Sequence, residues 1–244
     1  MTLPWIVAGA VGGVLAGPRI RASVFARGTE PGRPLRRACP ACARATGPGR
    51  HRWRWLFPVT GRCPACRARI GPPALSVELA AGAALAVAAA RAGSAWELAG
   101  LAWLALLAVP LTFIDISVRR LPDPLTAAAF AGTLALLAVA AVADGQPGHL
   151  ARAAIGAAVL PGFYLTLFVI SPSGIGLGDA KLAAGVGTAL GWLGWQSLLA
   201  GTFITFVLAA VYGGTLLVLR RATRASQLPL GPFIAIGALA AIAL

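Results

Sequence analysis

Two aspartates are the residues of this sequence whose side chains and positions best suit acid–base catalysis. The chain has only seven acidic residues. Asp115 ends the apolar run 104–114, and Asp179 precedes the apolar run that begins at Ala180. Two carboxyl groups close together in a poorly solvated site cannot both ionise easily, so one keeps its proton while the other activates water for attack on a peptide carbonyl. Asp115 and Asp179 are therefore our candidate catalytic pair of an aspartic endopeptidase.

Glycines surround the second aspartate. Gly176 and Gly178 allow backbone conformations that other residues avoid and permit the close approach of a substrate strand, so both are candidate supports of the active site. Taken alone, Gly-x-Gly-Asp is a weak signal in a chain with 30 glycines, and a loop joined to a helix cap also fits it. The second aspartate at a matching depth strengthens the functional interpretation.

Lys181 is the only lysine of the chain, against twenty arginines, and lies two residues after Asp179. We interpret it as a further support of the active site that pairs with Asp179 or holds a substrate carbonyl. The competing interpretation is a lysine that extends to the membrane surface from a helix end.

All four cysteines lie in one segment, as two Cys-Pro-Ala-Cys pairs separated by twenty residues: Cys39, Cys42, Cys63 and Cys66. This is the spacing of a four-thiolate zinc site, and four thiolates leave no open position for catalysis, so we predict a structural Zn²⁺. Two disulfides or free thiols are the alternatives. The predicted location in the reducing cytosol favours zinc over disulfides.

The elements that position these residues are apolar helices. The chain is 58% hydrophobic and 11% charged, with a mean hydropathy of +0.80, which is outside the range of a soluble domain. We predict an all-α, polytopic membrane protein with about eight transmembrane helices. The apolar runs lie at 2–17, 74–90, 95–114, 124–143, 150–170, 180–196, 198–219 and 229–244.

The basic residues predict the topology. Placing segment 19–73 in the cytoplasm leaves only Arg91 and Arg152 of the 21 basic residues outside, as the positive-inside rule expects. The hairpin formed by 124–143 and 150–170 then returns the chain to the same side. Asp115 and Asp179 therefore both belong at the cytoplasmic ends of their helices, where we also place the zinc module.

We divide the chain into a first transmembrane helix at 1–18, a basic zinc-binding module at 19–73 and a transmembrane peptidase domain at 74–244. The module carries 13 of the 21 basic residues. Because a basic segment tied to a membrane meets anionic lipid headgroups first, we expect lipid partners and no nucleic acid.

Two other acids require an explanation. Asp123 precedes Pro124, which predicts a helix N-cap followed by proline at the first helical position. Glu78 lies inside an apolar run, where an unpaired charge is expensive. An arginine of the zinc module is a plausible partner, but the sequence does not identify which one.

Together these motifs resemble the bacterial type IV prepilin peptidases. The two aspartate motifs are Thr112-Phe-Ile-Asp-Ile-Ser-Val-Arg-Arg-Leu-Pro-Asp123 and Gly176-Leu-Gly-Asp-Ala-Lys-Leu182. The four-cysteine module is similar to the cytoplasmic insert of that family, and Val77-Glu-Leu79 and Leu230-Gly-Pro-Phe233 resemble its flanking segments. The likeness extends from about residue 36 to residue 233.

The resemblance implies an endopeptidase of the bacterial cytoplasmic membrane that removes basic leaders from prepilins and pseudopilins. It also implies N-methylation of the new N-terminus with S-adenosylmethionine, although no spacing in the sequence indicates a site for that cofactor. The chain departs from the family at Ser117, where many members have a second acid, and at 22–30, which match poorly.

Two other functions remain open from the sequence. One is a different intramembrane aspartyl protease that shares Gly-x-Gly-Asp, against which the surroundings Leu121-Pro-Asp123 and Leu230-Gly-Pro-Phe233 argue. The other is a non-enzymatic, zinc-bearing membrane assembly protein whose aspartates are helix caps. Replacing either aspartate by asparagine distinguishes a protease from the non-enzymatic protein, because asparagine keeps the geometry but cannot transfer the proton. A protease should lose its function, and the assembly protein should keep it.

Overall fold

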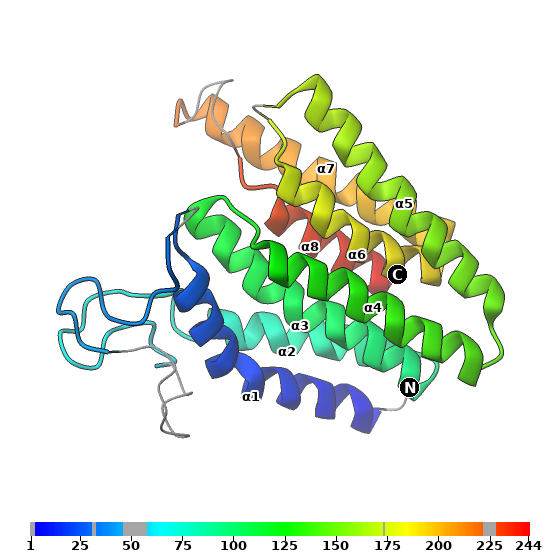
Figure 1. The fold of residues 1–244 in the computed structure, drawn as a ribbon, viewed down its shortest axis with the longest axis horizontal. Coiled ribbons are helices and arrows are strands. Elements are labelled where there is room, and N and C mark those ends of the chain that lie inside the picture. The colour runs from blue at the N-terminus through cyan, green and yellow to red at the C-terminus, as the bar shows by residue number, and fades with distance from the viewer. Residues whose placement is uncertain (1–2, 31–32, 46–57, 173, 222–227) are drawn as a thin grey trace.

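The computed structural model describes residues 3–30, 33–45, 58–172, 174–221 and 228–244. Within these ranges the protein is all-helical, with eight helices in the order shown in Figure 1. Their bounds are α1 Leu3–Arg27, α2 Ser76–Arg91, α3 Ala95–Val118, α4 Asp123–Ala143, α5 Pro147–Ile170, α6 Leu177–Leu193, α7 Trp195–Val218 and α8 Gly231–Ala243.

Among the described residues, five helices are long and apolar enough to cross a membrane: α1, α3, α4, α5 and α7. The chain is therefore a membrane protein built of helices, as the composition predicts. The other three are shorter, with 16 residues in α2, 17 in α6 and 13 in α8. Each predicted apolar run corresponds to one of these helices, while the prediction of eight crossings goes further than helix length and composition support.

Two helix boundaries have a clear physical cause, one local and one in the packing of helices. Gly194, at φ 140°, lies between α6 and α7, and only glycine adopts that backbone conformation readily, so the long apolar stretch is divided there. The first helix continues to Arg27, nine residues past residue 18. It does so because Ile20 and Val24 pack with Val77 of α2 and Ile114 of α3 in one buried cluster.

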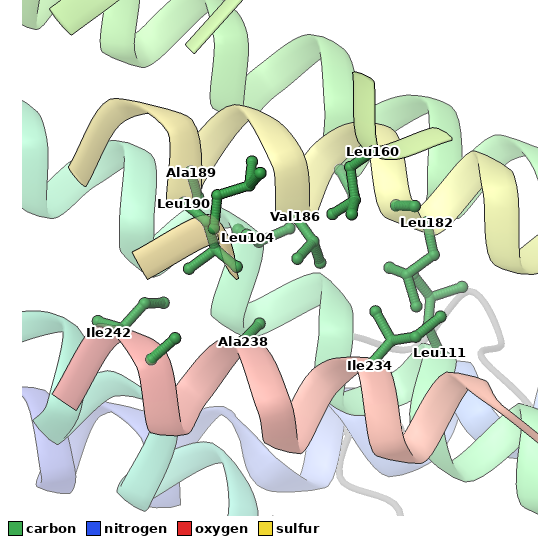
Figure 2. Packing of buried hydrophobic residues seen from close by; sticks show 14 of the residues in the cluster. Leu104, Leu111, Leu160, Leu182, Val186, Ala189, Leu190, Ile234, Ala238 and Ile242 are labelled. Carbon is green, nitrogen blue, oxygen red and sulfur yellow. The ribbon is translucent and has the colours of Figure 1, made fainter. Parts of the chain in front are cut away.

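Helix α6 lies at the centre of the bundle, where it packs against α5 on one side and α8 on the other (Figure 1). Figure 2 shows the core between these helices and α3, in which the side chains of Leu104, Val186 and Ile234 gather. Gly156 of α5 and Gly187 of α6 face each other so closely that a Cβ on either would overlap the carbonyl oxygen of the other. This contact fixes α6, and with it the position of Asp179, against α5.

An ion pair joins α1 to α2. The Arg21 Nε donates to Glu78 Oε1 at 2.6 Å, and the side chains are 0% and 4% exposed. The same guanidinium donates to the carbonyl oxygens of Pro72 and Pro73, at the end of the cysteine segment. Arg21 is thus the partner that the sequence could not identify for Glu78.

Candidate active site

The two candidate aspartates lie at the same end of the bundle. Asp115 is in the final turn of α3 and Asp179 is the third residue of α6, and they are only 4% and 7% exposed. Both line one pocket, although the hairpin α4–α5 separates them in the chain. The other residues of this pocket are Arg119, Pro172, Gly174, Ile175, Gly176, Leu228, Pro229 and Leu230.

The start of α6 orients Asp179. The backbone N–H of Gly176 donates to Asp179 Oδ2 at 2.9 Å, so the carboxyl group folds back over the N-terminus of its own helix. The partial positive charge of a helix N-terminus favours a carboxylate there. Gly176 therefore acts on Asp179 through its backbone. Gly178 instead allows close packing, because a Cβ there would lie 3.0 Å from Leu121 Cβ.

A different helix orients Asp115. The backbone N–H of Gly231, the first residue of α8, donates to Asp115 Oδ2 at 3.0 Å in a buried hydrogen bond. Gly231 is not among the site residues predicted from the sequence. The available signal was the Gly-Pro pair in Leu230-Gly-Pro-Phe233, since proline is common in the first turn of a helix and glycine permits close approach.

Lys181 contacts Asp123. Its Nζ lies 2.6 Å from Asp123 Oδ1, in an ion pair whose side chains are 50% and 69% exposed, and within the described residues it has no hydrogen bond to Asp179. The N-cap interpretation of Asp123 is wrong, because α4 begins at Asp123 itself with Pro122 in the cap position. The Asp123 side chain is instead the partner of Lys181.

The four cysteines come together in a cluster. The Sγ atoms of Cys39, Cys42, Cys63 and Cys66 all lie within 4.8 Å of one another, and none of the four is in a disulfide. The shortest contacts join the two pairs, at 3.7 Å between Cys39 and Cys66 and 3.8 Å between Cys42 and Cys63.

The two cysteine pairs have the same backbone turn. The carbonyl oxygen of Cys39 accepts from the N–H of Ala43, and that of Cys63 accepts from the N–H of Arg67. A single β-bridge closes each turn, Ala38 with Ala45 and Arg62 with Arg69. Two equal turns that present two thiols each match the two halves of a tetrahedral site.

Two of the four thiols have shifted pKa values, in opposite directions. Hydrogen bonds from the backbone N–H groups of Cys66 and Ala65 lower the pKa of the Cys63 thiol to about 6. The pKa of the Cys42 thiol is shifted the opposite way: the backbone hydrogen bond of Arg44 lowers it, but the neighbouring thiols, Cys66 foremost, and desolvation together raise it. The thiolate, which is the form that binds metal, is therefore favoured at Cys63 and disfavoured at Cys42. The four cysteines together fit a softly ligated ion such as Zn²⁺.

Comparison with known proteins gives a consistent result. The family model described as "Type IV leader peptidase family" matches residues 98–214, which include both aspartates. No solved structure matches the chain.

Several curated proteins named prepilin leader peptidase/N-methyltransferase are similar to the chain. The protein of Aeromonas salmonicida is 32% identical over 188 residues, which cover 75% of this chain and 61% of that protein. That of Pseudomonas aeruginosa is 30% identical over 211 residues, 82% of this chain and 68% of that protein. That of Burkholderia pseudomallei is 32% identical over 222 residues, 85% and 66% respectively. The chain thus spans between 61% and 68% of the length of these relatives.

Proposed function

Because the chain belongs to the type IV leader peptidase family, we propose that it is a membrane aspartic endopeptidase with Asp115 and Asp179 as its catalytic pair. The observation that carries this proposal is the shared pocket: two buried carboxyl groups, from helices far apart in the sequence, line one cavity at one end of the bundle. The two hydrogen bonds from glycine N–H groups each hold one carboxyl oxygen in place. Such preorganisation is what proton transfer at a fixed site requires.

In the proposed mechanism the pair shares one proton. The ionised carboxylate takes a proton from water as the water oxygen attacks the scissile carbonyl carbon, and the protonated carboxyl gives its proton to the carbonyl oxygen. When the tetrahedral intermediate collapses, the C–N bond breaks and the leaving amine receives the proton that the first carboxylate had taken. One hydroxyl group of the intermediate returns its proton to the second carboxylate as the C=O bond re-forms, which restores the pair with its single shared proton. The titration of the site then belongs to the pair as a whole.

The substrates that we propose are prepilins and pseudopilins, following the names of the relatives. Cleavage would take place at the cytoplasmic face of the bacterial cytoplasmic membrane, where the positive-inside rule predicts both aspartates and the cysteine module. In this arrangement all eight helices, including the shorter α2, α6 and α8, are embedded in the membrane. The basic segment would meet anionic lipid headgroups at that face.

The cysteine module is proposed to hold one structural Zn²⁺ through Cys39, Cys42, Cys63 and Cys66. Such an ion supplies folding free energy to a short segment with a small apolar core. Here that core consists of Phe25, Ile70, Cys39 and Cys63.

N-methylation of the new N-terminus with S-adenosylmethionine is a second candidate activity. The observation that favours it is the name of the relatives, which includes N-methyltransferase. Its test is the mass of the cleaved product, since one methyl group adds about 14 Da to the mature chain, and the mass is compared with and without added S-adenosylmethionine.

The test of the peptidase is a cleavage assay in membranes. The native chain, Asp115→Asn and Asp179→Asn are each expressed with a prepilin, and loss of the leader is followed by gel and mass spectrometry. Asp123→Asn is the matched control, because Asp123 is an acid at the same end of the bundle but does not line the pocket. We expect cleavage by the native chain and the control and none by the two variants of the pair. Cleavage by either of those two variants at the native rate would refute the mechanism.

A further inference from the structure

We propose that Gly231 is a positioning residue for Asp115, so that the first turn of α8 is a third component of the active site beside α3 and α6. This inference rests on the proposed peptidase function. It concerns a residue 116 positions away from Asp115 in the chain, whose N–H donates to the Asp115 carboxyl group at 3.0 Å. The pocket residues Leu228, Pro229 and Leu230 lead directly into this turn.

The hydrogen bond uses a donor that the helix leaves free. The first N–H groups of any helix have no partner within the helix, and they carry the positive end of its dipole. Gly231 is the first residue of α8, and the next residue, Pro232, has no N–H. The N–H of Gly231 is thus a fixed donor at the helix start, and the buried carboxyl oxygen of Asp115 satisfies it.

The position requires glycine because of the space around it. A Cβ on residue 231 would lie 2.8 Å from Asp115 Oδ2, 3.2 Å from its Cγ and 3.3 Å from its Cβ. All three atoms belong to the aspartate whose position matters for catalysis. Any larger residue at 231 must displace either the Asp115 carboxyl group or the start of α8.

Helix α8 is held too firmly to be the part that moves. Six residues after Gly231, a Cβ on Gly237 would overlap Thr205 Oγ1 and lie 2.6 Å from the carbonyl oxygen of Gly201, so α8 rests directly on α7. Ile234, one turn after Gly231, is 1% exposed and packs in the central core (Figure 2). A side chain at 231 therefore shifts the Asp115 carboxyl group.

Such a shift acts on the chemical step. A carboxyl group displaced by about 1 Å from its productive geometry is expected to lower kcat on the order of 100-fold. KM is expected to change by less than about two-fold, because the interaction is made in the transition state and not in substrate binding.

The experiment compares three glycine-to-alanine variants by their kcat and KM for prepilin cleavage and by their thermal unfolding. Gly231→Ala tests the inference. Gly237→Ala is the packing control, since it crowds the same helix without contacting an aspartate, and Gly162→Ala is the open control, since a Cβ there meets nothing within 4 Å. We expect the loss of kcat in Gly231→Ala alone. We expect Gly237→Ala to unfold at a lower temperature with near-native kcat per folded molecule, and Gly162→Ala to resemble the native chain.

A double substitution keeps the inference testable if Gly231→Ala does not fold. The substitution Asp115→Ala removes the carboxyl group, which makes the 2.8 and 3.2 Å contacts with the new Cβ, and leaves only the 3.3 Å contact with the Cβ of residue 115. The double variant Asp115→Ala with Gly231→Ala should therefore fold, and unfold at a temperature close to that of Asp115→Ala alone. A double variant that remains unfolded would overturn the inference.

The two proposals fail in different ways. Native kcat in Gly231→Ala, with Asp115→Asn inactive, overturns the role of Gly231 and leaves the peptidase mechanism intact. Activity in Asp115→Asn overturns the mechanism itself.

Discussion

The Arg21 guanidinium and the Glu78 carboxylate make a two-point contact out of reach of solvent. Nε lies 2.6 Å from Oε1, and an Nη atom lies 2.7 Å from Oε2. Gly17, one turn before Arg21, makes room for this contact, because a Cβ there would lie 2.5 Å from Glu78 Cγ. The pair fixes α1 against α2 at the point where the cysteine segment rejoins the bundle.

Removing only one member of this pair should destabilise the protein strongly. We expect Arg21→Met to lower the free energy of unfolding by about 3–5 kcal/mol, because it leaves the Glu78 charge buried without a partner. The double variant Arg21→Met with Glu78→Leu should recover most of that loss. Thermal unfolding of the purified protein in detergent measures both, with the exposed Arg19→Met as the control. A double variant as unstable as the single one would contradict the ion-pair explanation.

Substitution of Lys181 should have a small effect. Its ammonium lies on Asp123, and the pair is largely exposed, so Lys181→Met should cost less than about 1 kcal/mol of stability. We expect it to keep kcat within a few fold of native, unlike Asp179→Asn, because its ion pair is with an acid outside the pocket that Asp115 and Asp179 line. Steady-state kinetics of leader removal measure the effect. A loss of kcat equal to that of Asp179→Asn would restore Lys181 to the active site.

The close contact between α5 and α6 should not tolerate a methyl group. Gly187→Ala is expected to destabilise the protein by about 1–3 kcal/mol, since the added Cβ overlaps the backbone of Gly156. Gly162→Ala, on the same helix as Gly156 but in open space, is the control. Equal melting temperatures for the two variants would mean that the helices separate without cost.

The cysteine cluster should bind one metal ion for each folded chain, because four thiolates complete one tetrahedron. We expect Cys42→Ser to reduce bound zinc from about one ion per chain to well below one, as measured by elemental mass spectrometry of the purified protein. Ser76→Ala, at the start of α2 and outside the cluster, is the control. Zinc retained at the native level in Cys42→Ser would exclude a four-cysteine site.

Much of the fold could be predicted because it depends on local properties of the sequence. Runs of apolar residues with glycine or proline at their ends define the helices, and the observed starts and ends lie within a few residues of the predicted ones, apart from the end of α1. The placement of Asp115 and Asp179 at the same end of the bundle follows from topology, whereas the pocket that they share depends on how α3 and α6 pack. A hairpin between two helices returns the chain to the same side, whatever its side chains are.

Contacts that depend on the relative placement of distant helices could not be predicted. Nothing in the sequence near Lys181 distinguishes Asp179, two residues away, from Asp123, 58 residues away, as its partner. The hydrogen bond from Gly231 to Asp115 depends on the position of the start of α8 in the bundle. The ion pair between Arg21 and Glu78 depends on how α1 packs against α2. The predicted start of α4 is one residue late, because Pro122 takes the cap position that an aspartate usually fills.

The order of the helices along the chain has a consequence for biosynthesis. Of the three helices that contribute to the site, α3 is synthesised first, α6 follows after the hairpin α4–α5, and α8 comes last. Asp115 takes its backbone hydrogen bond from the start of α8. A nascent chain thus carries both aspartates into the membrane before the donor for Asp115 exists. On our proposal the enzyme becomes competent for cleavage only after α8 has inserted. Copies whose synthesis stops before α8 therefore do not cleave substrate.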